Sequence, residues 1–305
     1  MKLKSLLLNK TLHLFVLSFL IANCSAEKQK ELNSSEYKLL LKSDKFDNPL
    51  VGFKNYWEIV KTVAKNHNVA VVEKTEPFTL KHKEVSFFDT ERQELRKAGY
   101  LIRQKAKYKN GLKKPGFEYG VKYRQTDPAD ALAVDLALND GYTAKDETIE
   151  LESDIVYFSR NGESNETTYS ISNSILLDKA PEMRLGSFAE IYPALGKLGI
   201  QKTALLTKVA GVSVDEWMVA PGKLDFGDGL FGRVDMSVWI IPTQNGELRL
   251  AEFSFDHPFL DGKAYAKEAM DRCTNFIINL QEYEPDWVIL GALKAAFLFE
   301  LGEEQ

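Results

Sequence analysis

Charged side chains recur at every second position along several strand-like segments of this chain. The pairs are Glu36 and Lys38, Arg103 and Lys105, Lys122 and Arg124, Glu150 and Glu152, Arg233 and Asp235, and Glu252 with Ser254. Because residues two apart on a strand lie on the same face, each of these strands projects its polar groups to one side.

Two arrangements of the strands explain such faces. One face of an antiparallel sheet is often solvated, and this alone accounts for any single pair. Taken together, cations gather near residues 101–105 and 119–124, whereas acids stand near residues 36, 150 and 252. If the sheet closes into a barrel, both charges converge in a lumen. Cations there could bind phosphate oxygens, and carboxylates could hold a divalent cation.

Strand-like segments outnumber helical ones, and most are joined by hairpins or single helices. This pattern predicts an α+β fold with a predominantly antiparallel sheet. The expected strands are 34–41, 69–72, 86–88, 101–107, 119–125, 150–158, 202–209, 217–219, 232–241 and 247–256. The expected helices are 50–66, 89–98, 127–141, 187–199 and 262–283, and 287–301 is either a helix or a final strand.

Several of these boundaries follow from caps and turns. Asp127-Pro128 and Gly141 have the N-cap, first-turn proline and terminal glycine of a helix. Ser187 and Glu190 have the spacing of a capping box. The 244–246 turn, Gln-Asn-Gly, predicts a hairpin between the last two long strands.

The N-terminus has the composition of a secretory signal. Lys2, Lys4 and Lys10 precede an apolar run over residues 12–22. The run is too short to be a spanning helix, and a buried N-terminal helix is the alternative interpretation. Residues 1–23 are therefore expected to be a lipoprotein-type signal peptide, and the protein is expected to be exported.

The residues after this run decide how the protein is anchored. Ile21-Ala22-Asn23-Cys24 resembles a bacterial lipobox, in which Cys24 becomes the lipidated first residue, although Asn23 stands where a small residue is usual. A cut after Ala26 is the competing possibility. With lipidation, residues 24–33 form a tether, and a domain follows over 34–301. The protein would then lie in the cell envelope, either lipid-anchored or periplasmic or extracellular.

Composition excludes several classes of protein. Loss of residues 1–23 removes three lysines and no acids, so the net charge changes from −5 to −8. Such an acidic chain is not expected to bind nucleic acid. Only Cys24 and Cys273 are present, which excludes a disulfide framework, and the four histidines show no zinc spacing.

In this order, the motifs resemble the CYTH, or triphosphate tunnel metalloenzyme, superfamily. Residues 34–41 correspond to its N-terminal ExExK strand, and Phe88-Asp89-Thr90 through Lys105 correspond to its aromatic-Asp-Thr, helix, Gly and Arg-rich strand. The remaining matches are Lys122-Tyr123-Arg124, the basic stretch 205–208, the acidic strand 250–254, and, weakly, the C-terminal segment 292–297 with Lys294.

The resemblance implies an eight-stranded antiparallel tunnel that binds triphosphates or similar polyanions with Mg²⁺ or Mn²⁺ and usually hydrolyses them. By position, the metal ligands would be Glu36, Glu150, Glu152 and Glu252. The phosphate-binding residues would be Lys38, Arg103, Lys105, Lys122, Arg124, Lys208 and Arg233, with Arg184 as a further candidate.

Two positions depart from the family pattern, because Ser34 and Ser254 stand where the family has carboxylates. Each change removes a potential metal ligand, which puts catalysis in question. Three hypotheses follow. The chain is a divalent-cation-dependent phosphohydrolase of tripolyphosphate or organic triphosphates, a polyanion-binding tunnel without catalysis, or a non-catalytic envelope lipoprotein with a binding or structural role.

Overall fold

The computed structural model describes residues 32–159, 161–259 and 264–303. The predicted signal segment and Cys24 lie outside these ranges. No helix in the described ranges combines the length and the apolar character needed to cross a membrane.

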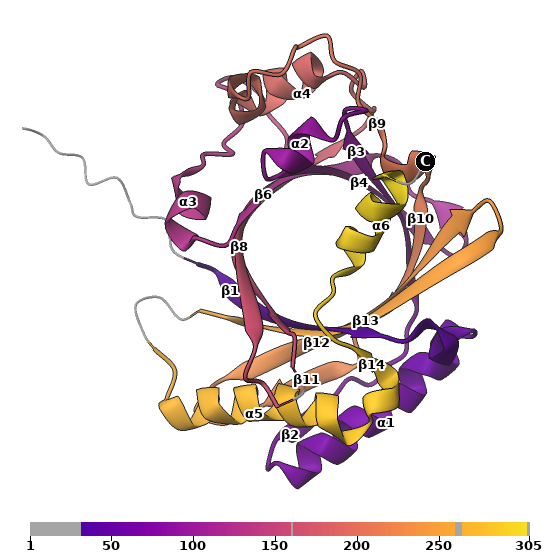
Figure 1. Cartoon of the computed structure of the whole chain (residues 1–305), viewed down its shortest axis with the longest axis vertical. Helices are drawn as coiled ribbons and strands as arrows, with labels where there is room; N and C mark the ends of the chain where they lie inside the picture. Colours follow the sequence, from indigo (N-terminus) through magenta and orange to yellow (C-terminus); the bar gives the residue numbers. More distant parts are fainter. Residues whose placement is uncertain (1–31, 160, 260–263, 304–305) are drawn as a thin grey trace, which may run out of the picture. The chain divides into compact units, whose positions relative to one another are not determined.

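Nine strands close into a ring around a central lumen (Figure 1). In spatial order they are β10 (Val214–Val219), β3 (Lys81–Asp89), β4 (Tyr100–Lys109), β6 (Phe117–Gln125), β8 (Asn165–Leu177), β7 (Lys145–Tyr157), β1 (Ser34–Leu41), β13 (Gly246–Pro258) and β12 (Phe231–Thr243). The pairing of β12 with β10 completes the ring. Among the described pairs of neighbouring ring strands, β1 and β7 alone run parallel.

This ring confirms the α+β fold with a predominantly antiparallel barrel. The ring has nine strands where the resemblance implied eight. Strand β8 has no counterpart among the expected segments, because its sequence alternates serine and threonine with apolar residues and carries no charged pair. It pairs with β6 on one side and β7 on the other.

Five short or peripheral strands extend this sheet. Strands β11 (Gly222–Asp225) and β2 (Ala70–Glu73) continue it from β12 outside the ring. The others each pair with one ring strand, and they are β5 (Leu112–Lys113), β9 (Thr207–Lys208) and β14 (Val288–Ile289).

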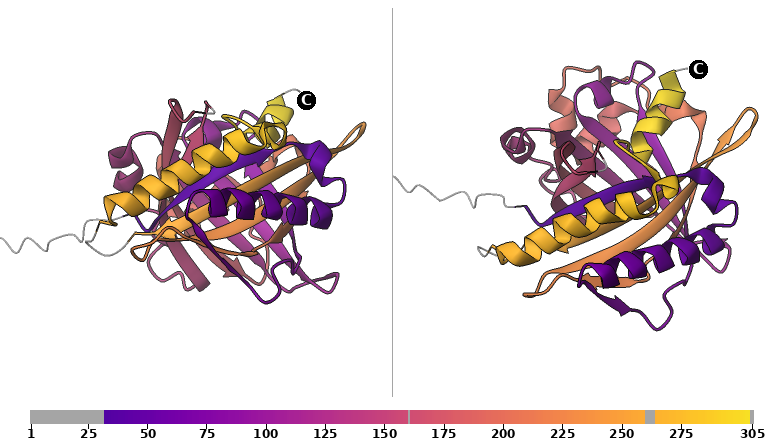
Figure 2. Two further views of the ribbon diagram at one scale, coloured as in Figure 1. Left: turned by 90° about the horizontal axis from the view of Figure 1, so that it is seen from below. Right: turned by 60° about the horizontal axis from the view of Figure 1, so that its bottom comes forward.

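Two long helices cover the outer face of β1, β13 and β12 (Figure 2). They are α1 (Pro49–Asn66), whose N-cap Asn48 accepts a hydrogen bond from the Val51 N–H, and α5 (Lys267–Tyr283). Buried aromatic side chains such as Tyr37, Phe253 and Phe255 pack between the sheet and these helices. This outer packing leaves the opposite face of the same strands for the lumen.

Shorter helices lie around the rest of the ring. They are α2 (Glu94–Lys97), α3 (Pro128–Ala133), α4 (Leu185–Ile191), α6 (Lys294–Glu303), and the 3₁₀ turns Ser43–Phe46, Pro193–Lys197, Val209–Gly211 and Pro285–Trp287. Helix α4 packs on the outer face of β6 and β8 through Phe188. Helix α6 lies across one end of the ring, where Leu298 and Phe299 pack beside Phe87 and Trp239.

Several expected elements are corrected by the structure. The predicted helix 127–141 ends at Ala133, and Leu136 is buried against the barrel in irregular backbone. Segment 202–209 forms a strand only at residues 207–208. The ambiguous segment 287–301 resolves into β14 and then α6, which extends to Glu303. The hairpin of β12 and β13 is confirmed.

One of two predicted helix starts, that of α4, is wrong, and the cap predicted for α2 is confirmed. The capping box at Ser187 and Glu190 is wrong, because α4 begins at Leu185 and buries Leu185 and Phe188 at three-residue spacing. Asp89 does cap α2, since its carboxylate accepts hydrogen bonds from the Leu95 and Arg96 N–H groups. That helix is shorter than predicted, because it begins only at Glu94.

Candidate functional site

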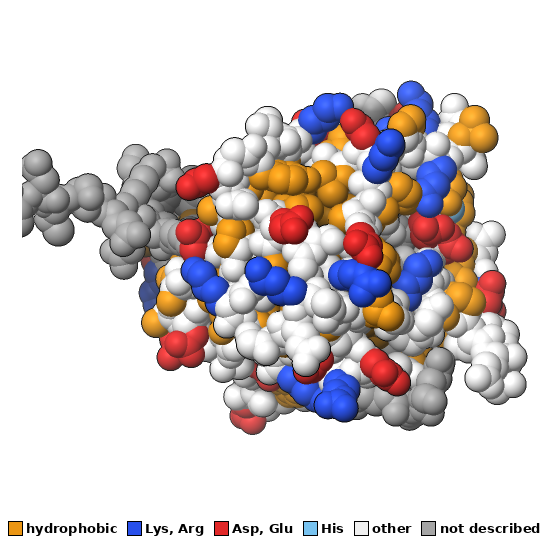
Figure 3. Space-filling view, turned by 90° about the horizontal axis from the view of Figure 1, so that it is seen from above, with side chains coloured by type: hydrophobic (Ala, Val, Ile, Leu, Met, Phe, Trp, Pro, Cys, Tyr) orange, Lys and Arg blue, Asp and Glu red, His pale blue; other side chains and the backbone are white. Residues whose placement is uncertain are grey.

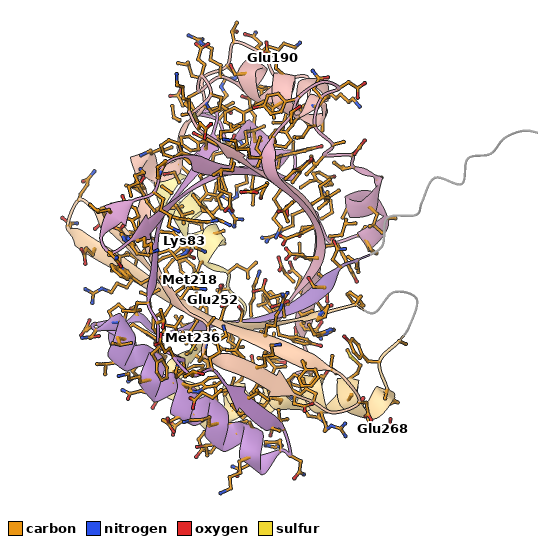
Figure 4. All side chains as sticks on the ribbon, turned by 180° about the vertical axis from the view of Figure 1, so that it is seen from behind. Lys83, Glu190, Met218, Met236, Glu252 and Glu268 are labelled. Atoms are coloured by element: carbon orange, nitrogen blue, oxygen red, sulfur yellow. The ribbon has the colours of Figure 1, made fainter. Side chains whose placement is uncertain are left out.

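The site begins with the alternation of side chains along the ring strands. On β1, Tyr37 and Leu39 face the outer core, so Glu36 and Lys38 face the lumen. The same two-residue alternation places the charged residues of every predicted pair on the inner face of their strand. Glu252 and Lys83 can be seen on the inner side of the ring in Figure 4, whereas Glu190 and Glu268 lie on peripheral helices.

Eight predicted residues line one cavity of about 260 Å³ in the lumen. They are Glu36, Lys38, Arg103, Lys122, Arg124, Glu150, Glu152 and Glu252. The alternation of charged residues was therefore enough to assign the inner faces of β1, β4, β6, β7 and β13. The closed ring brings these faces to a common cavity.

The other predicted residues do not line this cavity. Lys105 lines a neighbouring cavity of about 270 Å³, which it shares with Arg103 and Lys107. Arg233 is mostly exposed and is paired with Asp256. Lys208 is exposed outside the lumen cavity and donates a hydrogen bond to the Ser213 hydroxyl. The further candidate Arg184 pairs with Glu182, also away from the lumen.

A residue outside the predicted set, Asp154 on β7, is the centre of the ion pairs in the lumen. Its side chain is completely buried, and its carboxylate accepts hydrogen bonds from Lys38 Nζ at 2.7 Å and Arg124 at 2.8 Å. Burial alone would raise the pKa of Asp154, but the nearby cations Lys38, Lys122 and Arg124 hold that pKa well below its usual range. The carboxylate therefore already neutralises cations that were predicted to bind phosphate.

Serines on β8 make these pairs possible. Lys122 on β6 and Glu152 on β7 are separated by β8, yet Lys122 Nζ lies 3.0 Å from Glu152. In register, Ser172 stands beside Lys122 and Ser170 beside Glu152. Because serine side chains are short, the longer side chains of β6 and β7 meet over them.

Next to this cluster, two buried polar atoms have no hydrogen-bond partner among the residues that the structure describes. They are the Ser170 hydroxyl and Nε of Arg124, which are neighbours in the β6–β8 register. Ser170 is only 1% exposed. Unsatisfied buried groups of this kind are costly, so they indicate a position for water or a ligand atom.

A second charged cluster lies where α6 meets the ring. The Lys294 ammonium donates to the Ser237 hydroxyl at 2.5 Å and lies 3.3 Å from Glu252 and 3.9 Å from Glu216. It also lies 4.9 Å from the centre of the Trp239 ring. Burial alone would raise the pKa of Glu216, but Lys294 and Lys83 lower that pKa to about 2. Sequence reasoning missed Glu216 and Trp239, which belong to no charged pair.

The charges of the lumen are segregated by strand. The inner faces of β3, β4 and β6, which we call the basic arc, are predominantly cationic. They carry the acid Glu118, the acid Asp89 at the end of β3, and cations that include Lys81, Lys83, Arg103, Lys105, Lys107, Lys122 and Arg124. The inner faces of β7, β13, β12 and β10, which we call the acidic arc, are predominantly anionic. They carry the cation Arg233 and acids that include Glu150, Glu152, Asp154, Glu252, Asp256, Asp235 and Glu216. Strand β1 contributes one charge of each sign.

On the outer face shown in Figure 3, by contrast, basic and acidic side chains are interspersed. A ligand that enters the ring is offered opposite charges on two sides.

The carboxylates predicted to hold Mg²⁺ or Mn²⁺ do not fit a metal site. Three of the four are paired with lysines, as Glu36 with Lys38, Glu152 with Lys122 and Glu252 with Lys294. Across the described ranges, no three or more His, Cys, Asp or Glu side chains converge in a way that could hold a metal ion. Because metal ligands must present free oxygens, this donor set does not suit a divalent cation.

Comparison with known proteins gives likenesses of structure only. No family model and no curated protein matches the chain. Similar solved structures include a Hippeastrum candidate adenylyl cyclase described as having a dominant triphosphatase activity, which is 11% identical. That match covers 89% of this chain and 96% of the other, with a TM-score of 0.44. A candidate adenylate cyclase from Bacillus halodurans is 12% identical over 89% of this chain and 99% of its own, with a TM-score of 0.40.

Proposed function

We propose that the lumen binds a phosphorylated small molecule or a short polyphosphate through the basic arc. The observation that carries this proposal is Arg103. Within the described residues its guanidinium has neither a hydrogen bond nor an ion pair, although it lines both lumen cavities. A guanidinium presents a planar fork of donors that matches phosphate oxygens, so Arg103 is a ready phosphate contact.

The neighbours of Arg103 extend this contact along the arc. Lys105 and Lys107 share one carboxylate, Glu118, at 2.8 and 2.9 Å. Two cations per acid leave positive charge available at this end of the lumen. Burial, and after it the nearby Arg103 charge, lower the pKa of Lys105 to about 8.

The proposed function is binding and does not include hydrolysis. The carboxylates that would position a metal ion are engaged by lysines, and Ser34 and Ser254 supply hydroxyls where the family pattern has acids. Of the hypotheses raised by the sequence, a binding tunnel fits these pairs best. A non-catalytic envelope lipoprotein with a structural role is the alternative, and export and lipidation at Cys24 remain part of the proposal.

Thermal unfolding with tripolyphosphate tests the proposal, because a ligand that binds only the folded state raises the midpoint. We expect a saturable rise with or without Mg²⁺ or Mn²⁺, and about a tenfold loss of affinity in Arg103→Gln. The matched control is Arg184→Gln, which changes an exposed arginine outside the lumen. No shift in any condition, or an equal shift in both variants, would refute binding by the basic arc.

A further inference from the structure

The acidic arc already holds an ammonium group that comes from outside the ring. Lys294 is the first residue of α6, and its side chain is 7% exposed. Two carboxylates, a hydroxyl and an indole face surround its Nζ, as described above. These are the groups that recognise an organic cation, because carboxylates accept charged hydrogen bonds and an aromatic face attracts the positive charge.

The aromatic face separates this cluster from a metal site. The Trp239 N–H donates to Glu216 at 2.8 Å, which fixes the ring beside the carboxylates. An indole ring cannot ligate Mg²⁺ or Mn²⁺, whereas it does stabilise an alkylammonium ion. The cluster therefore suits an amine better than the divalent cation implied by the resemblance.

Other carboxylates of the acidic arc are left without a cation. Among the described residues, Glu150 and Asp235 make no ion pair, although both are on the lumen face. Burial and the neighbouring Glu152 raise the pKa of Glu150, and burial and Asp256 raise the pKa of Asp235. These two carboxylates thus remain unpaired on this side of the lumen, and a cation of the ligand placed beside them would favour their charged form.

The unsatisfied Ser170 hydroxyl lies on β8, between the two arcs, and Arg124 Nε lies beside it at the edge of the basic arc. A ligand that spans the lumen from the basic to the acidic arc would pass over the β8 serines, where these atoms could be satisfied.

We propose that Glu216, Glu252, Ser237 and Trp239 form an ammonium subsite, and that the ligand of the tunnel is a phosphate compound that also carries an amine. Lys294 occupies the subsite until the amine of the ligand replaces it. This inference rests on the proposed function, because the basic arc holds the phosphate of the same ligand.

Chemical rescue tests the subsite directly. Lys294→Ala removes the atoms beyond Cβ, which correspond to propylammonium. We expect propylammonium chloride to raise the unfolding midpoint of the variant saturably, by at least about 2 °C beyond the effect of equimolar NaCl. The effect should be absent from Lys294→Ala/Glu252→Gln and from Lys267→Ala, which truncates an exposed lysine on α5. An equal response in all variants would overturn the subsite.

The ligand class is tested on the unaltered protein, which needs no variant to fold. Calorimetry should show phosphoethanolamine binding at least about tenfold more tightly than ethyl phosphate. Equal or weaker binding of phosphoethanolamine, while ethyl phosphate and tripolyphosphate bind, would overturn this inference and leave the proposed function intact. Failure of every phosphate compound to bind would refute the proposed function and the ligand class together. Rescue by propylammonium would then still support the ammonium subsite alone.

Discussion

Replacing Asp154 by Asn should destabilise the free protein and at the same time strengthen its binding of polyanions. Asn keeps the size of the side chain but removes the charge that lies 2.7 Å from Lys38 Nζ and 2.8 Å from Arg124. Removing one partner of a buried ion pair leaves an uncompensated charge and typically costs about 3–5 kcal/mol. For a domain of this size, each kcal/mol lowers the midpoint by about 2–4 °C, so we expect a fall of roughly 10 °C.

The same substitution frees two cations for a ligand. In the wild type, a phosphate must compete with the Asp154 carboxylate for Lys38 and Arg124. In Asp154→Asn the phosphate supplies the missing negative charge, so tripolyphosphate should raise the midpoint more in the variant than in the wild type. Differential scanning fluorimetry over a tripolyphosphate titration measures both effects.

The sign of the pH dependence follows from the direction of the pKa shift. The folded pKa of Asp154 lies below its unfolded value of about 3.9, so its contribution is complete above that value and is lost as pH falls towards the folded pKa. The stability difference between wild type and Asp154→Asn should therefore be constant from pH 7 to 5 and shrink below about pH 4.

The control for this prediction is Asp271→Asn. It removes an exposed partner of Lys267 on α5 and should cost no more than about 0.5 kcal/mol. A ligand-induced shift in Asp154→Asn that is equal to or smaller than that of the wild type would refute the idea that Asp154 competes with the ligand.

Two further predictions concern Lys105 and the N-terminus. Because the pKa of Lys105 is about 8, its charge is lost between about pH 7 and 9, and tripolyphosphate affinity measured by calorimetry should fall over that range. Lys105→Arg, which stays charged, should flatten the profile, and an unchanged slope would exclude Lys105 from the site. Lipidation at Cys24 predicts that the mature protein partitions into detergent and that Cys24→Ser abolishes this. If neither form enters the detergent phase, the result would favour the cut after Ala26.

How far the sequence predicts the site depends on the strand. On β1, the alternation of Glu36 and Lys38 with apolar Tyr37 and Leu39 was enough to assign the inner face, because one face had to meet the outer core. On β8, alternating serines gave no comparable signal, so an entire wall of the lumen was missed. Lys208 is an error of the opposite kind, a predicted site residue that is not in the site. It was assigned from the order of the motifs along the chain, but it lies outside the lumen cavity.

Two-residue alternation in the sequence is enough to assign which side chains share a face, and it predicts that opposite charges gather inside if the sheet closes. How those charges are paired follows from the tertiary structure. Asp154 meets Lys38 and Arg124 because β7 lies beside β1 and because the short serines of β8 let β6 reach β7. Lys294 enters the lumen because α6 folds back across its end. A two-residue period fixes the direction of a side chain, whereas its partner depends on strands that are distant in the sequence and adjacent only in the ring.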